Sequence, residues 1–184
     1  MKKLIRCRVC GYVTEEHKLG EVCPICKVAS RAFEPLIMGT ASNARLFLIN
    51  LDLHAIVVHL SQSLAFIIPF MVLLLRLFPS VQSVFSHDTL YFLILIYPFA
   101  VLASFISGIL DGIFRLRSLG GWLPVTKMIA GVLMLALTVA LCFVAPADQY
   151  SLWTIILSLA SLAVAVFLGM KGKILSHIII PDGY

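Results

Sequence analysis

Four long stretches of the chain contain no Asp, Glu, Lys or Arg. A helix rises about 1.5 Å per residue, so about 20 apolar residues cross a hydrocarbon core that is about 30 Å thick. Each stretch is long enough to do so, and the sequence therefore predicts four transmembrane helices. The four stretches are Leu53–Leu75, Leu90–Leu110, Met128–Ala147 and Gln149–Met170.

The N-terminal segment differs in composition from the rest. Of the 184 residues, 61% are hydrophobic and only 12% are charged, whereas a soluble domain has about a quarter charged residues. This balance argues against an ordinary water-soluble enzyme. Residues 1–45 nevertheless hold 12 charged side chains and four of the five cysteines. We expect a small β domain at 1–36, a linker with an amphipathic entry to the membrane at 37–52, and an all-α four-helix transmembrane bundle at 53–184.

Within this bundle we expect helices at about 53–77, 90–114, 127–147 and 149–173. The distribution of Lys and Arg predicts their orientation, because cytoplasmic loops carry an excess of these residues. If the N-terminus is cytoplasmic, thirteen of the fourteen Lys and Arg residues fall on that side, and only Arg76 lies toward the outside. We therefore predict a multi-pass protein of a prokaryotic cytoplasmic membrane with both termini in the cytoplasm. The same distribution explains the net charge of +5, and no nucleic acid partner is expected.

Four cysteines in the N-terminal segment have the spacing of a metal site. Cys7, Cys10, Cys23 and Cys26 follow the pattern C-x2-C-x12-C-x2-C. Two such pairs on opposed turns place four thiolates at the corners of a tetrahedron, which suits either iron or zinc. Two disulfides are the alternative, but the predicted location faces the reducing cytoplasm. The spacing therefore favours a bound metal ion.

The same segment resembles the rubredoxin-like domain found at the C-terminus of rubrerythrins. The resemblance covers about residues 4–36 and rests on the run Cys7–Val13, on Cys23-Pro-Ile-Cys26, on Ala29 and on Phe33-Glu34. It implies that the four cysteines bind one iron, which cycles between ferric and ferrous and passes single electrons. Lys27 stands where that family usually has glycine, a residue that permits a turn with positive φ close to the metal. A zinc ribbon is therefore the alternative.

Positively charged residues lie close in the sequence to the predicted ligands of the metal site. They are Lys3, Arg6, Arg8 and Lys27. Four thiolates give the site a net charge of about −1 with ferric iron and −2 with ferrous iron, so nearby positive charge and backbone N–H groups favour the reduced form. The alternative is a solvated cationic surface near anionic lipid. The sequence leaves both interpretations open.

Ionisable residues near the start of the first span are candidates for function, because such residues are costly in a membrane. Asp52 and His59 are about 700° apart at about 100° per residue, so they share a helix face, whereas His54 and His59 are about 140° apart. Two residues so far apart on one straight helix cannot both bind the same metal ion. His177, at the predicted cytoplasmic edge of the fourth helix, is a third candidate if that helix continues past Lys173.

The second predicted helix carries a polar and small-residue face. Ser104, Gly108 and Gly112 are spaced by four residues, which favours close helix contact. Asp111 precedes Arg115 by four residues, so an ion pair within the helix is one interpretation. The alternative is that Asp111 orients a histidine or carries protons.

The segments Leu53–Leu60 and Ser107–Gly112 are similar to those of a four-helix bacterial membrane family of unassigned function. In that family the first helix typically reads His-Pro-x-x-Val-His-Phe-Pro, and relatives are joined to small redox modules such as Rieske-type domains. Ala55 and Ser61 replace the two prolines. The resemblance covers most of residues 46–170 and suggests a b-type haem or another electron carrier in the bundle.

If a haem is bound, His59 is the first choice as axial ligand and His54 the second, with Asp52 and Asp111 as supporting residues. The other ligand would be His177 or a histidine of a second copy. The alternatives for the histidines are hydrogen bonding with Asp111 or Ser107 without a cofactor, and a non-haem metal.

The leading hypothesis is a membrane-bound electron-transfer protein. Single electrons would pass from a cytoplasmic reductase or a ferredoxin-type donor, through the iron site, to a cofactor or acceptor in the bundle. The sequence leaves open whether the protein is a carrier or an oxidoreductase component, and whether it forms a homo-oligomer. One alternative is a structural or sensory membrane protein with a zinc-ribbon docking domain. Another is a small transporter with a proton relay through Asp52, His59 and Asp111.

Overall fold

The computed structural model describes residues 3–36, 53–80, 87–115 and 120–176. The chain divides into two compact units. The first combines Met1–Leu53 with Gly108–Met128 and Gly169–Tyr184, and the second combines His54–Ser107 with Ile129–Leu168. Asp52 and His177, two of the predicted site residues, lie outside the described residues.

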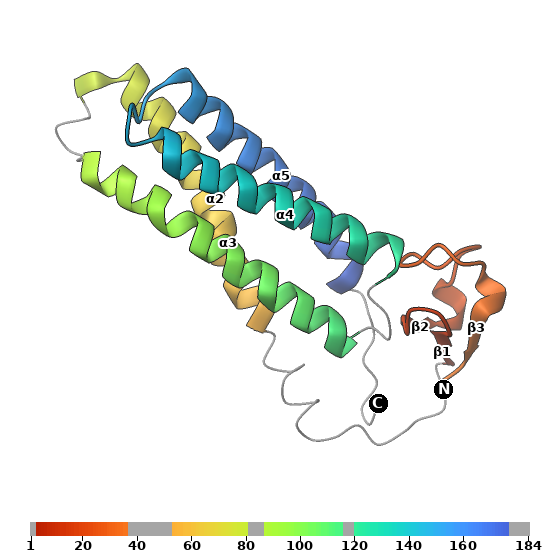
Figure 1. The fold of residues 1–184 in the computed structure, drawn as a ribbon. Helices are drawn as coiled ribbons and strands as arrows, with labels where there is room; N and C mark the ends of the chain where they lie inside the picture. Colours follow the sequence, from red (N-terminus) through yellow and green to blue (C-terminus); the bar gives the residue numbers. More distant parts are fainter. Residues whose placement is uncertain (1–2, 37–52, 81–86, 116–119, 177–184) are drawn as a thin grey trace. The chain divides into compact units, whose positions relative to one another are not determined.

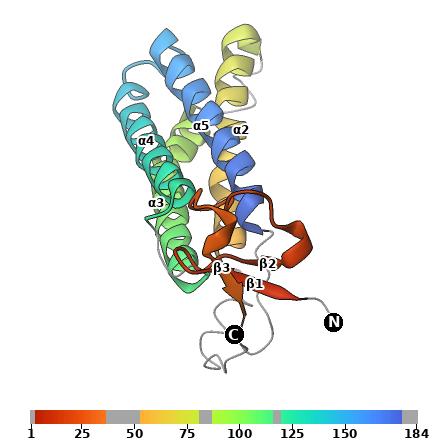
Figure 2. The ribbon, with the colours of Figure 1, turned by 90° about the vertical axis from the view of Figure 1, so that its right-hand side faces the viewer.

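The N-terminal segment forms a small antiparallel sheet, drawn in red and orange in Figure 2. Strands β1 (Leu4–Cys7), β2 (Val13–Glu15) and β3 (Phe33–Pro35) lie in the order β2-β1-β3. Leu4 pairs with Glu15 on one side of β1, and Cys7 pairs with Phe33 on the other. Two short 3-10 helices, Glu16–Lys18 and Ser30–Ala32, connect the sheet to the loop segments. The expected small β domain is therefore confirmed.

Four long helices follow the sheet (Figure 1). They are α2 (Leu53–Leu77), α3 (His87–Arg115), α4 (Trp122–Val144) and α5 (Leu152–Ser176). All four are long and apolar enough to cross a membrane. The predicted fold class, a β domain followed by four membrane-spanning helices, is thus confirmed.

Helix α4 begins five residues before the expected start at residue 127, because Lys127 lies inside the helix and not at its border. A lysine near the end of a span can extend its long stem so that the ammonium group reaches the interface. The charge-free stretch in the sequence therefore predicts the apolar centre of α4 but not its first turn. The helix also ends at Val144, two residues before Pro146.

A seven-residue turn, 145–151, joins α4 to α5 and is held by local hydrogen bonds. Ser151 precedes the first residue of α5, and its Oγ accepts a hydrogen bond from the Thr154 backbone N–H at 3.2 Å. This is the usual N-cap arrangement, in which a side-chain oxygen accepts from an otherwise unpaired N–H of the first turn. Asp148 accepts a second bond from the Tyr150 N–H at 2.8 Å. These contacts stabilise the short turn between α4 and α5.

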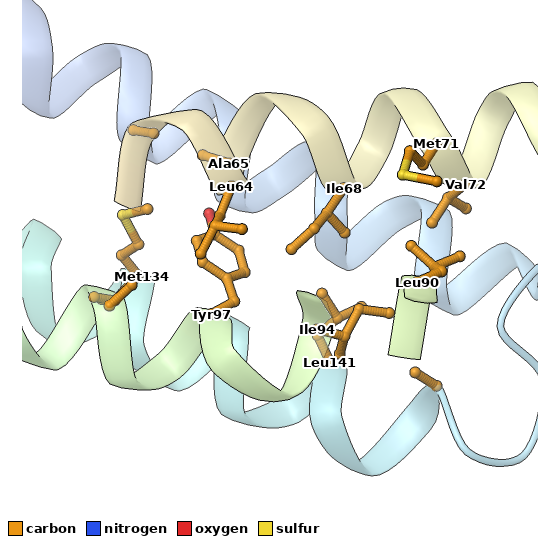
Figure 3. Packing of buried hydrophobic residues seen from close by; sticks show 14 of the residues in the cluster. Leu64, Ala65, Ile68, Met71, Val72, Leu90, Ile94, Tyr97, Met134 and Leu141 are labelled. Carbon is orange, nitrogen blue, oxygen red and sulfur yellow. The ribbon is translucent and has the colours of Figure 1, made fainter. Parts of the chain in front are cut away.

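The core of the second unit lies between its helices (Figure 3). Tyr97 of α3 is fully buried there, near Leu64 and Ala65 of α2. Large apolar side chains also cover the outside of the unit: Phe66, Phe70 and Phe99 are between 62% and 72% exposed. Water would penalise such an apolar surface, whereas lipid would not. The outer surface therefore agrees with a helix bundle that is surrounded by a membrane.

Candidate metal centre

The two cysteine pairs lie on two turns with the same backbone hydrogen bonds. In the first turn, the Gly11 N–H donates to the Cys7 carbonyl at 3.0 Å, and the Cys7 N–H donates to the Tyr12 carbonyl at 2.8 Å. In the second, the Lys27 N–H donates to the Cys23 carbonyl at 2.9 Å. Both turns contain a residue with positive φ, Gly11 at 81° and Lys27 at 63°. Lys27 thus takes the left-handed conformation that glycine adopts easily, and the second turn is preserved despite the substitution.

The four sulfur atoms converge on one point, and two of the distances between them match the edge of a metal-centred tetrahedron. The Sγ atoms of Cys7 and Cys26 are 3.7 Å apart, as are those of Cys10 and Cys23, and all four lie within 4.8 Å of one another. For metal–sulfur bonds of about 2.3 Å, the edge of the tetrahedron is about 3.8 Å. A disulfide bond is about 2.05 Å long, and all the cysteines are free. The geometry therefore fits a metal site with four cysteine ligands and not two disulfides.

Hydrogen bonds within the cluster favour a thiolate at Cys23. The Cys10 thiol lowers the pKa of Cys23 to about 5, with further help from the backbone N–H groups of Ile25 and Cys26. The same hydrogen bond, together with burial, raises the pKa of Cys10. Burial also raises the pKa of Cys26. Metal binding must therefore displace protons from this cluster.

The site is enclosed by apolar side chains. Cys7, Cys10 and Cys23 are fully buried, whereas Cys26 is only partly so. The rings of Tyr12 and Phe33 meet edge to face with centroids 6.4 Å apart. Such a shell limits the access of solvent to a metal site and thereby influences its potential.

The predicted positive charges have different surroundings. Arg6 and Arg8 both donate to Glu34, with N···O distances of 2.9 and 3.0 Å. The hydrogen bond from Arg6, followed by that from Arg8, lowers the pKa of the Glu34 carboxyl group. The two arginines are therefore partly neutralised by Glu34. The Lys27 ammonium group instead lies over the Trp122 ring, 5.0 Å from its centroid.

The first turn of α4 belongs to the same compact unit and closes the site. Leu123 is fully buried in the cluster that contains Cys7, Cys10 and Cys23. Its backbone N–H donates to the Ile25 carbonyl at 3.1 Å. A Cβ on Gly121 would lie 3.3 Å from the Ile25 carbonyl oxygen and 3.4 Å from the Cys26 Cβ.

These α4 residues were not among the predicted site residues. Glycine followed by an apolar run with an early proline, as in Gly121-Trp122-Leu123-Pro124, signals the start of a helix. No local signal shows that this start contacts a turn about a hundred residues earlier in the chain.

The polar residues of α2 and α3 form a network between the helices of the second unit. His54 Nδ1 and Ser107 Oγ are 3.0 Å apart. Ser104 Oγ donates to Ser61 Oγ at 2.9 Å and also lies within hydrogen-bond distance of the Ala100 carbonyl of its own helix. The small residues of α3 therefore allow α2 to approach closely, and His54 makes the contact with Ser107 that one of the sequence-based alternatives predicted.

His59 lies on a different side of α2. Its side chain is exposed, and its carbonyl accepts a bond from Ser63 Oγ at 2.8 Å in the same helix. His54 and His59 are thus separated around the helix as their spacing predicts. Asp111, in the first unit, is half-buried and interacts electrostatically with Lys127. The side chain of Arg115 lies outside the described residues, so the predicted ion pair with Asp111 stays a prediction.

Among the residues that the structure describes, the four cysteines are the group of potential metal ligands that converges on one point. Residues 6–34 match the family model described as "Rubrerythrin, rubredoxin-like domain". This segment is a rubredoxin-like domain. The match spans the four cysteines and agrees with the resemblance noted in the sequence. No curated protein and no solved structure matches the chain.

The rubredoxin-like domain is therefore joined to four helices that are fit to span a membrane. Its four-cysteine site is of the iron or zinc type. The resemblance of the helical part to a bacterial membrane family stays a prediction.

Proposed function

We propose that this protein transfers single electrons between a soluble donor and the membrane, with an iron held by the four cysteines of its rubredoxin-like domain as the carrier. The observation that carries the proposal is the convergence of four thiols at tetrahedral distances in a chain with four membrane-spanning helices. An iron held by four thiolates supplies reversible one-electron chemistry with little change of coordination.

The residues of the domain support this role. Three of the four cysteines are fully buried, and apolar side chains surround them. The backbone N–H groups near Cys23 favour negative charge on its sulfur, which is the form that binds a metal ion. The cation of Lys27 adds positive potential on the side of the second turn. These features bind the ion and stabilise a negatively charged cluster.

The membrane topology belongs to the same proposal. Eight Lys and Arg residues precede the first span, which supports a cytoplasmic N-terminus and, with four spans, a cytoplasmic C-terminus. A prokaryotic cytoplasmic membrane is the proposed location. The donor would be a cytoplasmic reductase or a ferredoxin-type protein. The acceptor would be a cofactor or another electron acceptor in the membrane. With a lipid-soluble quinone as the acceptor, two chains would each give one electron, and two protons taken up from water would complete the quinol.

The proposal does not require a haem in the bundle. His54 and His59 lie on different sides of α2, so one haem iron cannot take both from the same chain. A haem bound by His59 would therefore need His177 or a histidine of a second copy. The contact of His54 with Ser107 supports the alternative, in which this histidine joins two helices without a cofactor.

The test is a visible spectrum of the detergent-purified protein before and after dithionite, together with metal analysis. The proposal predicts one iron per chain and thiolate-to-iron bands that bleach on reduction. A colourless protein with one zinc per chain would overturn it and favour the structural or sensory alternative. An additional Soret band that is lost in His59→Ala would establish a haem with His59 as ligand, whereas a spectrum without that band rejects the haem.

A further inference from the structure

We infer that the second cysteine turn, Cys23 to Val28, docks on Gly121, Trp122 and Leu123 at the start of α4. We call this contact surface the docking seat. Lys27 and Trp122 are positioning residues that hold the metal centre there. The inference deepens the proposed electron transfer and rests on it, because the seat defines where an electron leaves the rubredoxin-like domain. Every residue that carries the inference belongs to the first compact unit.

Helix α4 lacks a capping side chain of its own. The first N–H groups of a helix have no partner within the helix, and the N-cap side chain usually accepts from one of them. In α4 the N-cap position is Gly121, whose carbonyl accepts from Val125, and a glycine has no side chain to offer. Pro124, at the third helical position, has no N–H. Of the N–H groups in this first turn, that of Leu123 donates to the Ile25 carbonyl at 3.1 Å. The cysteine turn thus supplies the cap.

The surfaces of the helix and of the second cysteine turn fit closely. Gly121 lies directly against this turn, where an added Cβ would stand 3.3 to 3.5 Å from Ile25 and Cys26 atoms. The 3.3 Å distance to the Ile25 carbonyl oxygen is tighter than most contacts of a real Cβ, whereas the distances to Cys26 are ordinary van der Waals contacts. Leu123, on the other hand, fills the apolar shell of the cysteines with no exposed surface. A small residue and a large apolar residue therefore occupy the positions that close contact requires.

The contact with α4 also explains Lys27. A left-handed conformation costs a non-glycine residue about 1–2 kcal/mol, so glycine would relax the backbone at this position. The lysine instead places its ammonium group 5.0 Å from the centre of the Trp122 ring, and Lys171 of α5 lies 5.1 Å from the same ring. A cation over a tryptophan face is attracted by it. The departure from the usual glycine is thus accounted for by a contact that only a domain docked on this helix can make.

The Cys26 side of the metal site lies next to the start of α4. Cys26 is the least buried of the four cysteines, and it is the one that Gly121 contacts. Cys26 is therefore the ligand from which an electron would pass to the first turn of α4.

The experiment measures docking without electron flow. In a Trp153→Phe background, Trp122 is the single tryptophan of the full-length protein, and its fluorescence is compared between iron-loaded and zinc-loaded samples in detergent. Tryptophan emission overlaps the thiolate-to-iron absorption, whereas a zinc site has no such absorption. Because Trp122 also lies beside the metal centre, iron quenches its emission and zinc does not. We expect loss of most of the emission in the iron form. Equal emission from the two forms would overturn the inference.

Two substitutions make the test specific. Lys27→Gly relaxes the cysteine turn and leaves the ligands in place, and we expect it to restore much of the emission in the iron form. Lys27→Arg keeps the cation, and we expect the emission of the iron form to stay quenched. Gly121→Val is expected to restore it as well. The matched control is Gly20→Val, because nothing lies within 4 Å of a Cβ at that position. Unchanged quenching in Lys27→Gly, with iron still bound, would contradict the role of Lys27 even if Gly121→Val does not fold.

The two proposals fail separately. Quenching that depends on Lys27, in a protein whose reduced iron gives no electron to a quinone, supports the docking seat and rejects electron transfer. Electron transfer that is as fast in Lys27→Gly as in the parent chain, together with unchanged quenching, supports electron transfer and rejects the docking seat.

Discussion

Lys27 illustrates how one residue can oppose the local preference of the backbone. Its φ of 63° is costly for a lysine, yet the turn keeps the hydrogen bonds of the first cysteine turn, in which Gly11 has the equivalent place. The presence of lysine at this position is therefore explained by its long-range contact with Trp122 and not by the local backbone geometry alone. This is why the sequence could identify the departure from glycine but not its physical reason.

Glu34 is expected to make the stability of the rubredoxin-like domain depend on pH. Its folded-state pKa lies below the usual value because of the hydrogen bonds from Arg6 and Arg8. A lowered pKa adds stability that is present above the unfolded pKa, near 4.5, and that is lost as the pH falls through the folded pKa. The wild type should therefore lose more thermal stability than Glu34→Gln between about pH 6 and about pH 3. Identical slopes for the two proteins would show that the ion pairs contribute nothing.

Gly131 is required for the contact between α4 and α3. A Cβ at this position would lie 2.6 Å from Cδ2 of Phe105, closer than real Cβ contacts. Gly131→Ala should therefore destabilise the bundle by about 1–3 kcal/mol, the usual effect of overpacking. Gly172→Ala is the control, because the position is open. Denaturation in mixed micelles measures both, and equal stability of the two variants would contradict the close contact.

At the scale of helices, α2 and α3 are joined by hydroxyl groups and a histidine. Ser104 of α3 donates to Ser61 of α2, and Ser107 of α3 lies within hydrogen-bond distance of His54 of α2. The sequence predicted close packing here from the spacing of small residues. It also predicted that His54 and His59 lie on different faces, because this follows from the helical repeat alone.

Ser107→Ala should weaken this contact between α2 and α3. Removal of the hydroxyl group leaves His54 Nδ1 without the partner at 3.0 Å, and hydrogen bonds between membrane helices contribute about 0.6 kcal/mol on average. The variant should unfold in mixed micelles at a lower denaturant fraction. Ser63→Ala is the matched control, since Ser63 Oγ bonds to the carbonyl of its own helix at His59. A loss that is as large in the control would show that the network has no special role.

At the scale of the whole molecule, the sequence predicted the fold class because both of its signals are local. Charge-free stretches define the spans, and two C-x2-C pairs define the metal site. The contact of Gly121 and Leu123 with the second cysteine turn depends on tertiary packing, so no pattern within a short window reveals it. The same holds for the exposed position of His59, which depends on how the helices pack around α2.

Metal removal is expected to unfold one part of the molecule and spare the other. The four cysteines form the centre of the apolar cluster with Tyr12 and Leu123, so a chelator should abolish the near-ultraviolet signal of that cluster. The core of the helices consists of different residues, among them Leu64, Ile68 and Tyr97. The far-ultraviolet helical signal should therefore persist. Loss of both signals together would contradict two separate cores.

The central claim is that the metal centre gives electrons to the membrane. The most direct test places the protein in liposomes with a lipid-soluble quinone, reduces the metal site with a stoichiometric soluble reductant, and follows the visible bands. We predict that the bleached bands return when the quinone is present, that they stay bleached without it, and that one quinol forms for two chains. Bands that stay bleached in the presence of quinone would contradict the claim.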